Sequence, residues 1–284
     1  MFEVEPSNAP KSAPARSPDR RGGEPCQAVE VCHAEGCAPV LILCDHAGRR
    51  IPERLGDLGL PEAELSRHIA YDIGAAEVTR VLARLLDAPA VLCQISRLVI
   101  DPNRQPGDPT SIPKVSDGTA IPGNQAVDAE EARRRLHASF VPYHRQIARR
   151  IARLRRRVGV PAIVSIHSLT PVMSGVYRPW EIGVLWNRDA RLARPVLDAL
   201  SADRSLCVGD NVPYSGRFPV GYSIPFHADR TGLPHVTFEI RQDLIDTPEK
   251  AAGWAERVAD VLRAPLADAT LYRRISHQDA APCP

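Results

Sequence analysis

The chain has 284 residues, of which 44% are apolar and 25% are charged, so it is long enough to bury a sizeable core. Lys and Arg number 36 against 34 for Asp and Glu, and a net charge of +2 gives no global reason to expect nucleic acid or an anionic membrane as the partner. No apolar run approaches the ~20 residues of a membrane-spanning helix and the N-terminus lacks the features of a secretory signal, so we expect a cytoplasmic protein.

The seven cysteines are scattered, their number is odd, and no two of them form a Cys-x-x-Cys pair. This usage argues against a disulfide framework and against a thiolate zinc site, so we expect reduced thiols. The cluster of Cys26, Cys32, His33 and Cys37 resembles a metal site only loosely, because no second ligand pair follows at the spacing of a zinc finger.

The N-terminal segment, residues 1–36, is rich in Pro, Ser, Arg and Gly and shows no apolar period, which predicts a disordered tail. A single α/β domain is expected over 37–270, with a C-terminal tail over 271–284. The first predicted strand, 38–44, is a continuous apolar run that stops at the polar segment Asp45-His46-Ala47-Gly48.

Further apolar runs bounded by turn residues indicate strands, and apolar residues at steps of three and four indicate helices. In chain order the sequence predicts a helix over 74–87, strands over 90–93 and 98–100, a functional loop over 105–124, a helix over about 129–158 kinked by Pro142, strands over 161–166 and 181–186, a helix over 189–201, strands over 206–208 and 235–240, and a helix over 249–263. Alternating strands and helices predict an α/β fold, a three-layer sandwich with a mixed, largely parallel sheet and helices on both faces.

The long predicted helix carries many arginines on one face, which taken alone suggests a phosphate-binding surface. Glu130 and Glu131 stand in its first turn, and no aromatic residues interleave with the arginines. A solvated helix face explains these arginines better, and we expect no nucleic-acid partner.

Polar side chains gather where the predicted strands end, the edge at which open α/β sheets bind ligands. They are Asp45, His46, Arg97, Asp101, Asn103, Arg104, His167, Ser168, Glu239 and Arg241. Neither glycine-rich nucleotide fingerprint is present, and no G-x-S-x-G elbow occurs, which disfavours nucleotide chemistry and a serine hydrolase.

Two imidazoles and a carboxylate that leave one open position describe a catalytic zinc site, at which a free glutamate can act as general base. Adjacent Asn and Arg side chains suit a substrate carboxylate, since a guanidinium binds it through two parallel hydrogen bonds.

Five motifs in order, spread from about Val40 to Leu262, resemble the N-formylglutamate amidohydrolase family. They are Asp45-His46-Ala47-Gly48, Tyr71-Asp72-Ile73-Gly74-Ala75, the segment from Ser96 to Arg104, Ser165-Ile166-His167-Ser168, and the segment from Phe238 to Leu244. The resemblance implies a zinc-dependent hydrolase with the α/β fold of zinc carboxypeptidases and aspartoacylases. It also implies that Asp101, Asn103 and Arg104 hold the substrate carboxylate and that Glu239 is the base.

The third metal ligand is the point at which the sequence departs from the zinc carboxypeptidases, which supply a His-x-x-Glu pair. Three residues after His46 stands Arg49, which cannot ligate a cation. Asp72 is our choice beside His46 and His167, with Glu53 and Asp45 as alternatives. Asp72 could instead cap the helix predicted over 74–87.

A long loop, 214–234, precedes the strand of Glu239 and is rich in Gly, Pro and polar residues. His227 and Arg230 in this loop are candidates for contacting substrate or stabilising an oxyanion, and ordinary loop packing is the alternative.

The leading hypothesis is hydrolysis of a small N-acyl amino acid such as N-formyl-L-glutamate, with one zinc ion or another divalent metal and Glu239 as base. Asn103 and Arg104, with Arg97 or Arg241, would hold the carboxylate. The alternatives are an amidase or deacylase for a different small amide and a non-catalytic binding protein of the same fold. The oligomeric state stays open.

Overall fold

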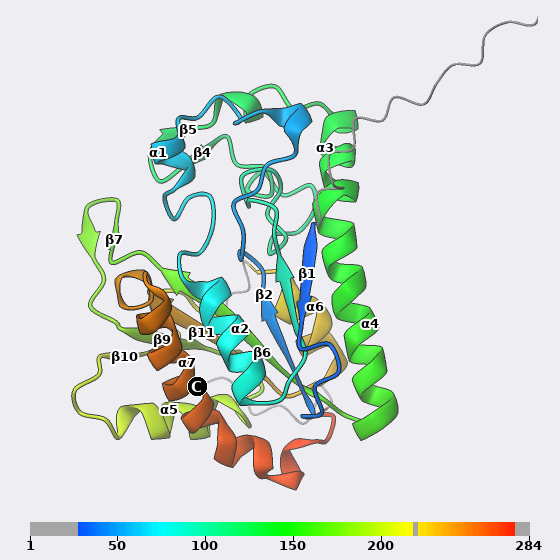
Figure 1. Cartoon of the computed structure of the whole chain (residues 1–284), viewed down its shortest axis with the longest axis vertical. Coiled ribbons are helices and arrows are strands. Elements are labelled where there is room, and N and C mark those ends of the chain that lie inside the picture. Colours follow the sequence, from blue (N-terminus) through cyan, green and yellow to red (C-terminus); the bar gives the residue numbers. More distant parts are fainter. Residues whose placement is uncertain (1–27, 218–220, 276–284) are drawn as a thin grey trace, which may run out of the picture.

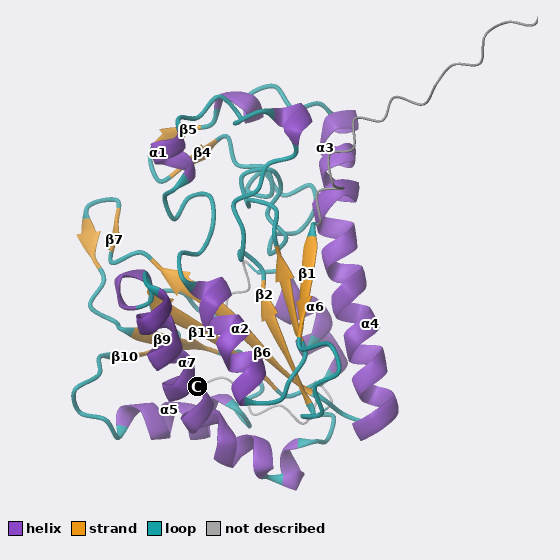
Figure 2. Ribbon diagram, in the orientation of Figure 1, coloured by secondary structure: helices purple, strands orange, loops and turns teal. Residues whose placement is uncertain are grey.

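The computed structural model describes residues 28–217 and 221–275, so most of both expected tails lies outside the described residues. Seven strands form one central sheet (Figures 1 and 2). In spatial order they are β1 (Val29–Cys32), β3 (Ala90–Cys93), β2 (Val40–Cys44), β6 (Ala162–Leu169), β11 (His235–Arg241), β9 (Ile182–Leu185) and β10 (Val208–Asp210).

The centre of the sheet is parallel, and antiparallel neighbours flank it. β3, β2, β6 and β11 run parallel to one another, β1 and β9 are antiparallel to β3 and β11, and β10 is parallel to β9. Every residue of β2, β3, β6 and β11 is buried, as expected for strands covered on both faces. The predicted mixed, largely parallel sheet is confirmed.

Helices cover both faces of the sheet, so the molecule has three layers (Figure 1). Side chains alternate along β2: Val40 and Ile42 pack into the core under one helical layer, and Leu41 and Leu43 pack into the core under the other. The first layer holds α2 (Ala75–Leu85), α5 (Ala193–Ser201) and α7 (Pro248–Ala267), and the second holds α4 (Val141–Val158) and α6 (Ser223–His227).

Smaller elements surround the edge of the sheet at which the strands end. They are α1 (Glu62–Leu65), the hairpin of β4 (Val115–Ser116) and β5 (Thr119–Ala120), α3 (Ala129–Arg135), and the hairpin of β7 (Val172–Met173) and β8 (Val176–Tyr177). The β4–β5 hairpin lies inside the segment predicted to be a functional loop. Among the described residues, no helix combines the length and apolarity needed to span a membrane.

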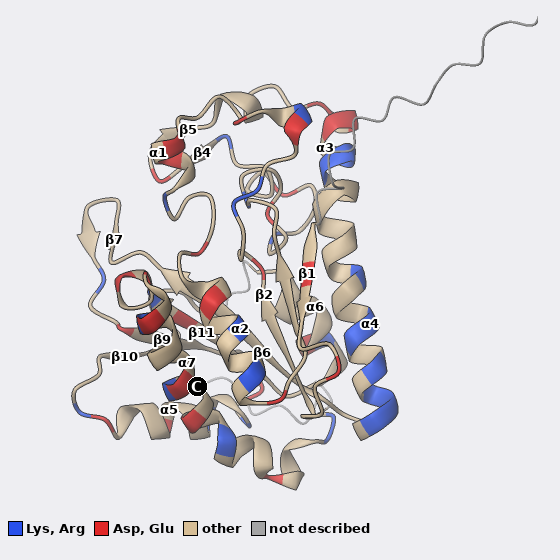
Figure 3. Cartoon of the chain, viewed as in Figure 1, with Lys and Arg blue, Asp and Glu red and all other residues tan. Residues whose placement is uncertain are grey.

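The long predicted helix consists of two helices joined by a π-helical turn. α3 ends at Arg135, the π turn spans Leu136–Phe140, and α4 begins at Val141. Proline lacks the backbone N–H that the interior of a continuous helix requires. The chain accommodates Pro142 by placing it in the first turn of α4, just after the π turn. Most of the basic residues on α4 lie toward its C-terminal end (Figure 3).

The predicted strand over 98–100 is wrong: this segment is a turn. Its carbonyl groups accept hydrogen bonds from side chains, since Asn124 Nδ2 donates to Leu98 O at 2.9 Å and Arg135 Nη1 donates to Val99 O at 3.2 Å. Arg135 is therefore buried, in contrast to the expected solvated arginine face.

The expected N-terminal tail also includes too many residues. Val29–Cys32, within the range 1–36, forms β1 and pairs with β3 along its whole length. The four residues of β1 are not recognised as a strand from the sequence, because the burial of their side chains depends on pairing with β3.

Candidate active site

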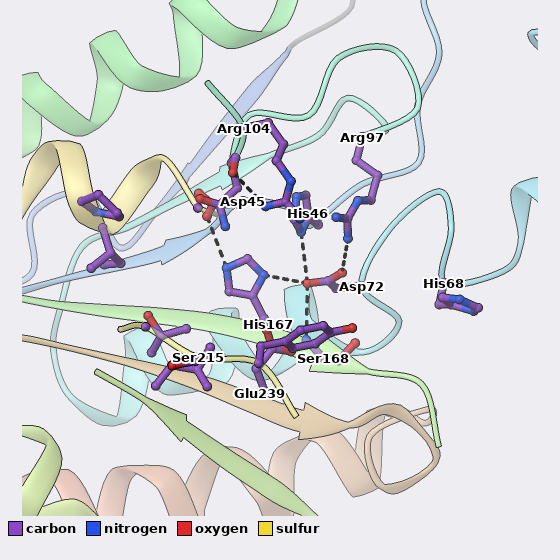
Figure 4. A pocket seen from close by; sticks show the side chains of 18 of the residues that line it. Asp45, His46, His68, Asp72, Arg97, Arg104, His167, Ser168, Ser215 and Glu239 are labelled. Carbon is purple, nitrogen blue, oxygen red and sulfur yellow. Dashed lines mark hydrogen bonds and ion pairs between the residues drawn. The ribbon is translucent and has the colours of Figure 1, made fainter. Parts of the chain in front are cut away.

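Three parallel strands bring the site together at one edge of the sheet (Figure 4). Asp45 and His46 follow β2 directly, His167 lies in β6, and Glu239 lies opposite His167 in β11. Asp72 comes from the loop before α2, and its backbone N–H donates to His46 O at 2.9 Å. The strand ends thus converge as the sequence predicts.

His46, Asp72 and His167 form a buried cluster, and their ligand atoms lie within 4.8 Å of one another. Asp72 Oδ2 lies 3.3 Å from His46 Nδ1 and 2.8 Å from His167 Nδ1. Two imidazoles and one carboxylate are the donor set of a catalytic zinc site with an open position. The residues therefore fit a zinc ion.

The outer nitrogen of each imidazole faces a second buried carboxylate. His46 Nε2 lies 2.8 Å from Asp101 Oδ1, and His167 Nε2 lies 3.2 Å from Asp45 Oδ2. The His46–Asp101 contact is a hydrogen bond and the His167–Asp45 contact is an ion-pair distance; with the proton on Nε2 of each ring, Nδ1 keeps the lone pair that a metal requires. This arrangement is typical of histidine ligands in metalloproteins.

The charges of the cluster also suit a cation. Four carboxylates are buried here, those of Asp45, Asp72, Asp101 and Glu239, and Arg97 is the arginine that contacts two of them. Burial alone would raise the pKa of Asp72, but the neighbouring imidazoles outweigh it and hold this pKa well below its usual range. The same carboxylates outweigh burial and raise the pKa of both imidazoles, and a divalent cation in place of the imidazole protons would balance the negative charge of the cluster.

The geometry favours Asp72 over the alternatives for the third ligand. Helix α2 has Gly74 at its N-cap with φ of 78°, and no side chain caps it, so Asp72 does not serve as the cap. Asp45 Oδ1 accepts hydrogen bonds from Tyr143 Oη and Ser223 Oγ, each at 2.7 Å. Glu53 is exposed in a short 3₁₀ helix and does not line the cavity.

Glu239 lines the cavity beside this cluster and has the properties of a general base. Burial, together with the negative charge of Asp72, outweighs the opposing effect of the imidazoles and of Arg97 and raises the pKa of its carboxyl group to about 7. A base whose pKa is near the working pH is present in its deprotonated form and is also basic enough to accept a proton.

Of the residues expected to hold a carboxylate, Arg97, Asn103 and Arg104 line the cavity, with different contacts, whereas Asp101 is not among the lining residues and contacts His46 and Arg97 instead. Arg97 binds the cluster itself, with Nη2 3.0 Å from Asp101 Oδ2 and Nη1 3.5 Å from Asp72 Oδ1. Asn103 Oδ1 accepts hydrogen bonds from the backbone N–H groups of Tyr222 and Ser223. Arg104 Nη1 donates to Asn103 O at 3.1 Å.

Three other expected substrate contacts are not on the described cavity wall. His227, the last residue of α6, has its Nε2 3.0 Å from His144 Nδ1 of α4. The guanidinium of Arg230 stacks on the Phe226 ring, and that of Arg241 is held by Asp243 beyond the strand end. These local partners orient the side chains away from the cavity, which the sequence pattern does not report.

The cavity has a volume of about 270 Å³ and includes residues that the sequence analysis missed. They include His68, Leu185, Trp186, Tyr214 and Thr237. Thr237 lies two residues before Glu239 on the same strand, a spacing that could have identified it. No sequence spacing identifies Tyr143 as a neighbour of the site, because Tyr143 lies 98 positions from Asp45, whose carboxylate it contacts.

A glutamate with a pKa near neutrality next to a metal-fitting cluster, at the carboxyl edge of a three-layer α/β sheet, is suited to activating water, so the fold and the site indicate a hydrolase. The comparison with known families is more specific. The chain belongs to the N-formylglutamate amidohydrolase family, whose model matches residues 38–246. The resemblance found in the sequence is confirmed.

One curated protein and two solved structures are similar to this chain. An N-formylglutamate deformylase from Pseudomonas putida is 29% identical over 151 residues, which are 48% of this chain and 53% of that protein. The match thus spans about half the length of this relative. The crystal structure of a gene product from Agrobacterium tumefaciens is 38% identical with a TM-score of 0.81, over 84% of this chain and 95% of that one. The N-formylglutamate amidohydrolase from Ralstonia eutropha shares the fold, with a TM-score of 0.58 at 18% identity over 84% of this chain and 98% of its own.

Proposed function

We propose that this protein hydrolyses the amide bond of a small N-acyl amino acid of the N-formyl-L-glutamate type, giving the free amino acid and a carboxylic acid. The observation that carries the proposal is the position of Glu239 in a cavity beside the His46, Asp72 and His167 cluster. Family membership and the deformylase relative support the same reaction.

We assign one zinc ion to His46, Asp72 and His167, because their donor atoms suit that metal. A bound zinc ion acidifies water and polarises a carbonyl group. Asp45 and Asp101 hold the outer nitrogens of the two imidazoles and so fix the orientation of both rings.

Glu239 takes the proton of the attacking water and then gives it to the leaving nitrogen, so one side chain acts as base and then as acid. Its pKa of about 7 supports both steps near neutral pH. Arg104, with Asn103, binds the carboxylate of the amino-acid part through charge-assisted hydrogen bonds. Arg97 keeps Asp72 and Asp101 in place. A cytoplasmic location belongs to this proposal, and the described cysteines are all free.

The test combines metal analysis of the purified full chain with an assay of formate released from N-formyl amino acids. Wild-type protein should hold one zinc ion per chain, and Asp72→Ala should lose both metal and turnover. The matched control is Glu53→Ala, which removes an exposed carboxylate that was an alternative ligand and should leave both unchanged. Metal-free protein with full turnover would overturn the metal assignment. Metal-loaded protein that binds N-formyl amino acids without turnover would favour the non-catalytic alternative.

A further inference from the structure

Tyr143 and His144, two consecutive residues near the start of α4, hold different parts of the site. Tyr143 donates to a carboxylate beside the metal-fitting cluster. The Nε2 atom of His144 lies 2.9 Å from the carbonyl oxygen of Pro102, which directly precedes Asn103 and Arg104 on the cavity wall. His144 is buried and is not among the described lining residues, so any contribution it makes to the reaction passes through the segment that it holds.

The hydrogen bonds of His144 have one direction. A carbonyl oxygen only accepts, so Nε2 of His144 carries the proton in its contact with Pro102. Burial lowers the pKa of His144, so the ring is neutral near pH 7 and its Nδ1 keeps a lone pair. This lone pair accepts from Nε2 of His227, 3.0 Å away at the end of α6. Burial, with the neighbouring imidazole, lowers the pKa of His227 to about 3, so two neutral rings connect α6 to the Pro102 carbonyl.

The start of α6 holds the same segment through a side chain. The backbone N–H groups of Tyr222 and Ser223 donate to Asn103 Oδ1 at 2.7 and 3.0 Å. The segment is therefore held at a side chain by α6 and at a carbonyl group by the imidazole of α4. Arg104 Nη1 donates to Asn103 O at 3.1 Å, so the position of this guanidinium depends on the backbone that both helices hold.

Aromatic packing fixes the ring of His144 separately from its hydrogen bonds. The centroid of the Phe140 ring lies 4.2 Å away, that of Tyr222 lies 4.8 Å away, and the imidazole of His227 stacks on the ring. Because these contacts depend on ring shape, the substitution His144→Phe keeps most of the packing and removes both hydrogen bonds. Packing and hydrogen bonding can therefore be tested apart.

We propose that His144 is a positioning residue, which holds the backbone before Arg104 so that this guanidinium meets the carboxylate of the substrate. The inference rests on the proposed function, because the carboxylate is that of the proposed N-acyl amino acid. A guanidinium binds a carboxylate through two parallel hydrogen bonds, so a small displacement of its backbone weakens both. Consecutive residues of α4 then have separate tasks: Tyr143 supports the metal-fitting cluster, and His144 supports the anchor of the carboxylate.

Two probes separate binding of the carboxylate from the chemistry: N-formyl-L-glutamate and N-formyl-γ-aminobutyrate, which lacks only the α-carboxylate. His144→Phe should lower kcat/KM about tenfold for the first compound, mainly through KM, and change it less than about twofold for the second. Its zinc content should equal that of the wild type. Tyr143→Phe should show the opposite pattern, with weaker zinc binding and equal effects on both probes.

Two amide side chains test which hydrogen bond matters. His144→Asn keeps an acceptor near Nδ1 for His227 but is too short to reach the Pro102 carbonyl, whereas His144→Gln places an N–H near the position of Nε2. The proposal predicts that the asparagine variant behaves like His144→Phe and that the glutamine variant recovers most of the loss. Both variants keep a polar group next to His227, so they decide the question even where His144→Phe does not fold.

The action of His144 through Arg104 is tested by a double-mutant cycle. In the Arg104→Ala protein, His144→Phe should cause no further loss of kcat/KM for N-formyl-L-glutamate, because the guanidinium that it positions is gone. The matched control is His137→Phe, which replaces an exposed histidine in the π turn before α4 and should leave kcat and KM unchanged in either background.

Titration calorimetry of both probes with Glu239→Gln protein, with and without His144→Phe, reads the inference independently of turnover. Weaker binding of N-formyl-L-glutamate alone, with no formate released by the wild type, would support the positioning role and overturn the proposed hydrolysis. Formate release by the wild type would leave the hydrolysis intact, and the inference would then be overturned by any of three results. These are equal losses on both probes, an equal loss with and without Arg104, and recovery by the asparagine variant instead of the glutamine variant.

Discussion

The phenol of Tyr143 connects the helical layer to the metal-fitting cluster, and replacing Tyr143 by Phe removes that connection with little change of shape. Tyr143 is fully buried in α4, and its hydroxyl donates to Asp45 Oδ1 at 2.7 Å. Burial and the charge of Asp45 raise the pKa of this phenol well above its usual value, so it stays a proton donor. The other oxygen of Asp45 lies 3.2 Å from His167 Nε2.

The expected cost follows from these contacts. A hydrogen bond to a charged group contributes about 1.5–3 kcal/mol, and Asp45 keeps a second donor to the same oxygen in Ser223 Oγ. We therefore expect Tyr143→Phe to lower the free energy of unfolding by about 2 kcal/mol, or the melting temperature by about 4–8 °C for a domain of this size. Because Asp45 orients His167, zinc affinity should fall about tenfold, as for other residues that support a metal ligand.

The assay is urea unfolding together with zinc competition against a chelator. Tyr272→Phe is the control: its hydroxyl donates to Leu266 O at 2.6 Å, a neutral acceptor, so stability should fall by about 1 kcal/mol and zinc affinity should not change. Unchanged zinc affinity in Tyr143→Phe, with the stability loss of the control, would refute the argument that Asp45 orients His167.

Three further predictions concern the site directly. His46→Ala and His167→Ala should each lose bound zinc and turnover together, as metal analysis will show, and stoichiometric zinc in both variants would contradict the ligand assignment. Glu239→Gln should keep its zinc while kcat falls by roughly 10²-fold or more. In the wild type, kcat/KM should rise with pH through about 7 as Glu239 loses its proton, and a flat pH profile would exclude this base. Arg104→Ala should lower kcat/KM for an N-acyl amino acid yet hardly alter hydrolysis of the matching amide without the carboxylate, and equal loss on both would indicate a structural role.

The sequence by itself predicts the main strands in their order along the chain and the polar residues at their ends. The apolar run before Asp45 and His46 and the run that ends just before His167 correspond to β2 and β6, and both strands are fully buried. Once parallel strands are recognised, their carboxyl ends must share one edge, so the convergence of His46, His167 and Glu239 follows from local patterns.

Local patterns fail where the partner of a group is distant in the chain. The segment 98–100 has the composition of a strand, but its carbonyls bond to the side chains of Asn124 and Arg135. The burial of Arg135 cannot be predicted from the sequence for the same reason. Nothing in the sequence distinguishes a helix arginine that binds buried partners from one that is exposed to solvent.

Only tertiary structure brings Asp72 next to both imidazoles and places a second carboxylate at the outer nitrogen of each ring. Asp72 is 26 positions from His46 and 95 from His167, Asp101 is 55 positions from His46, and Asp45 is 122 positions from His167. The lining of the cavity arises in the same way, from side chains of separate segments that share no periodic pattern. A sequence period reports which face of one element is buried, whereas the contacts of a site depend on how several elements pack, and that packing is a property of the whole core.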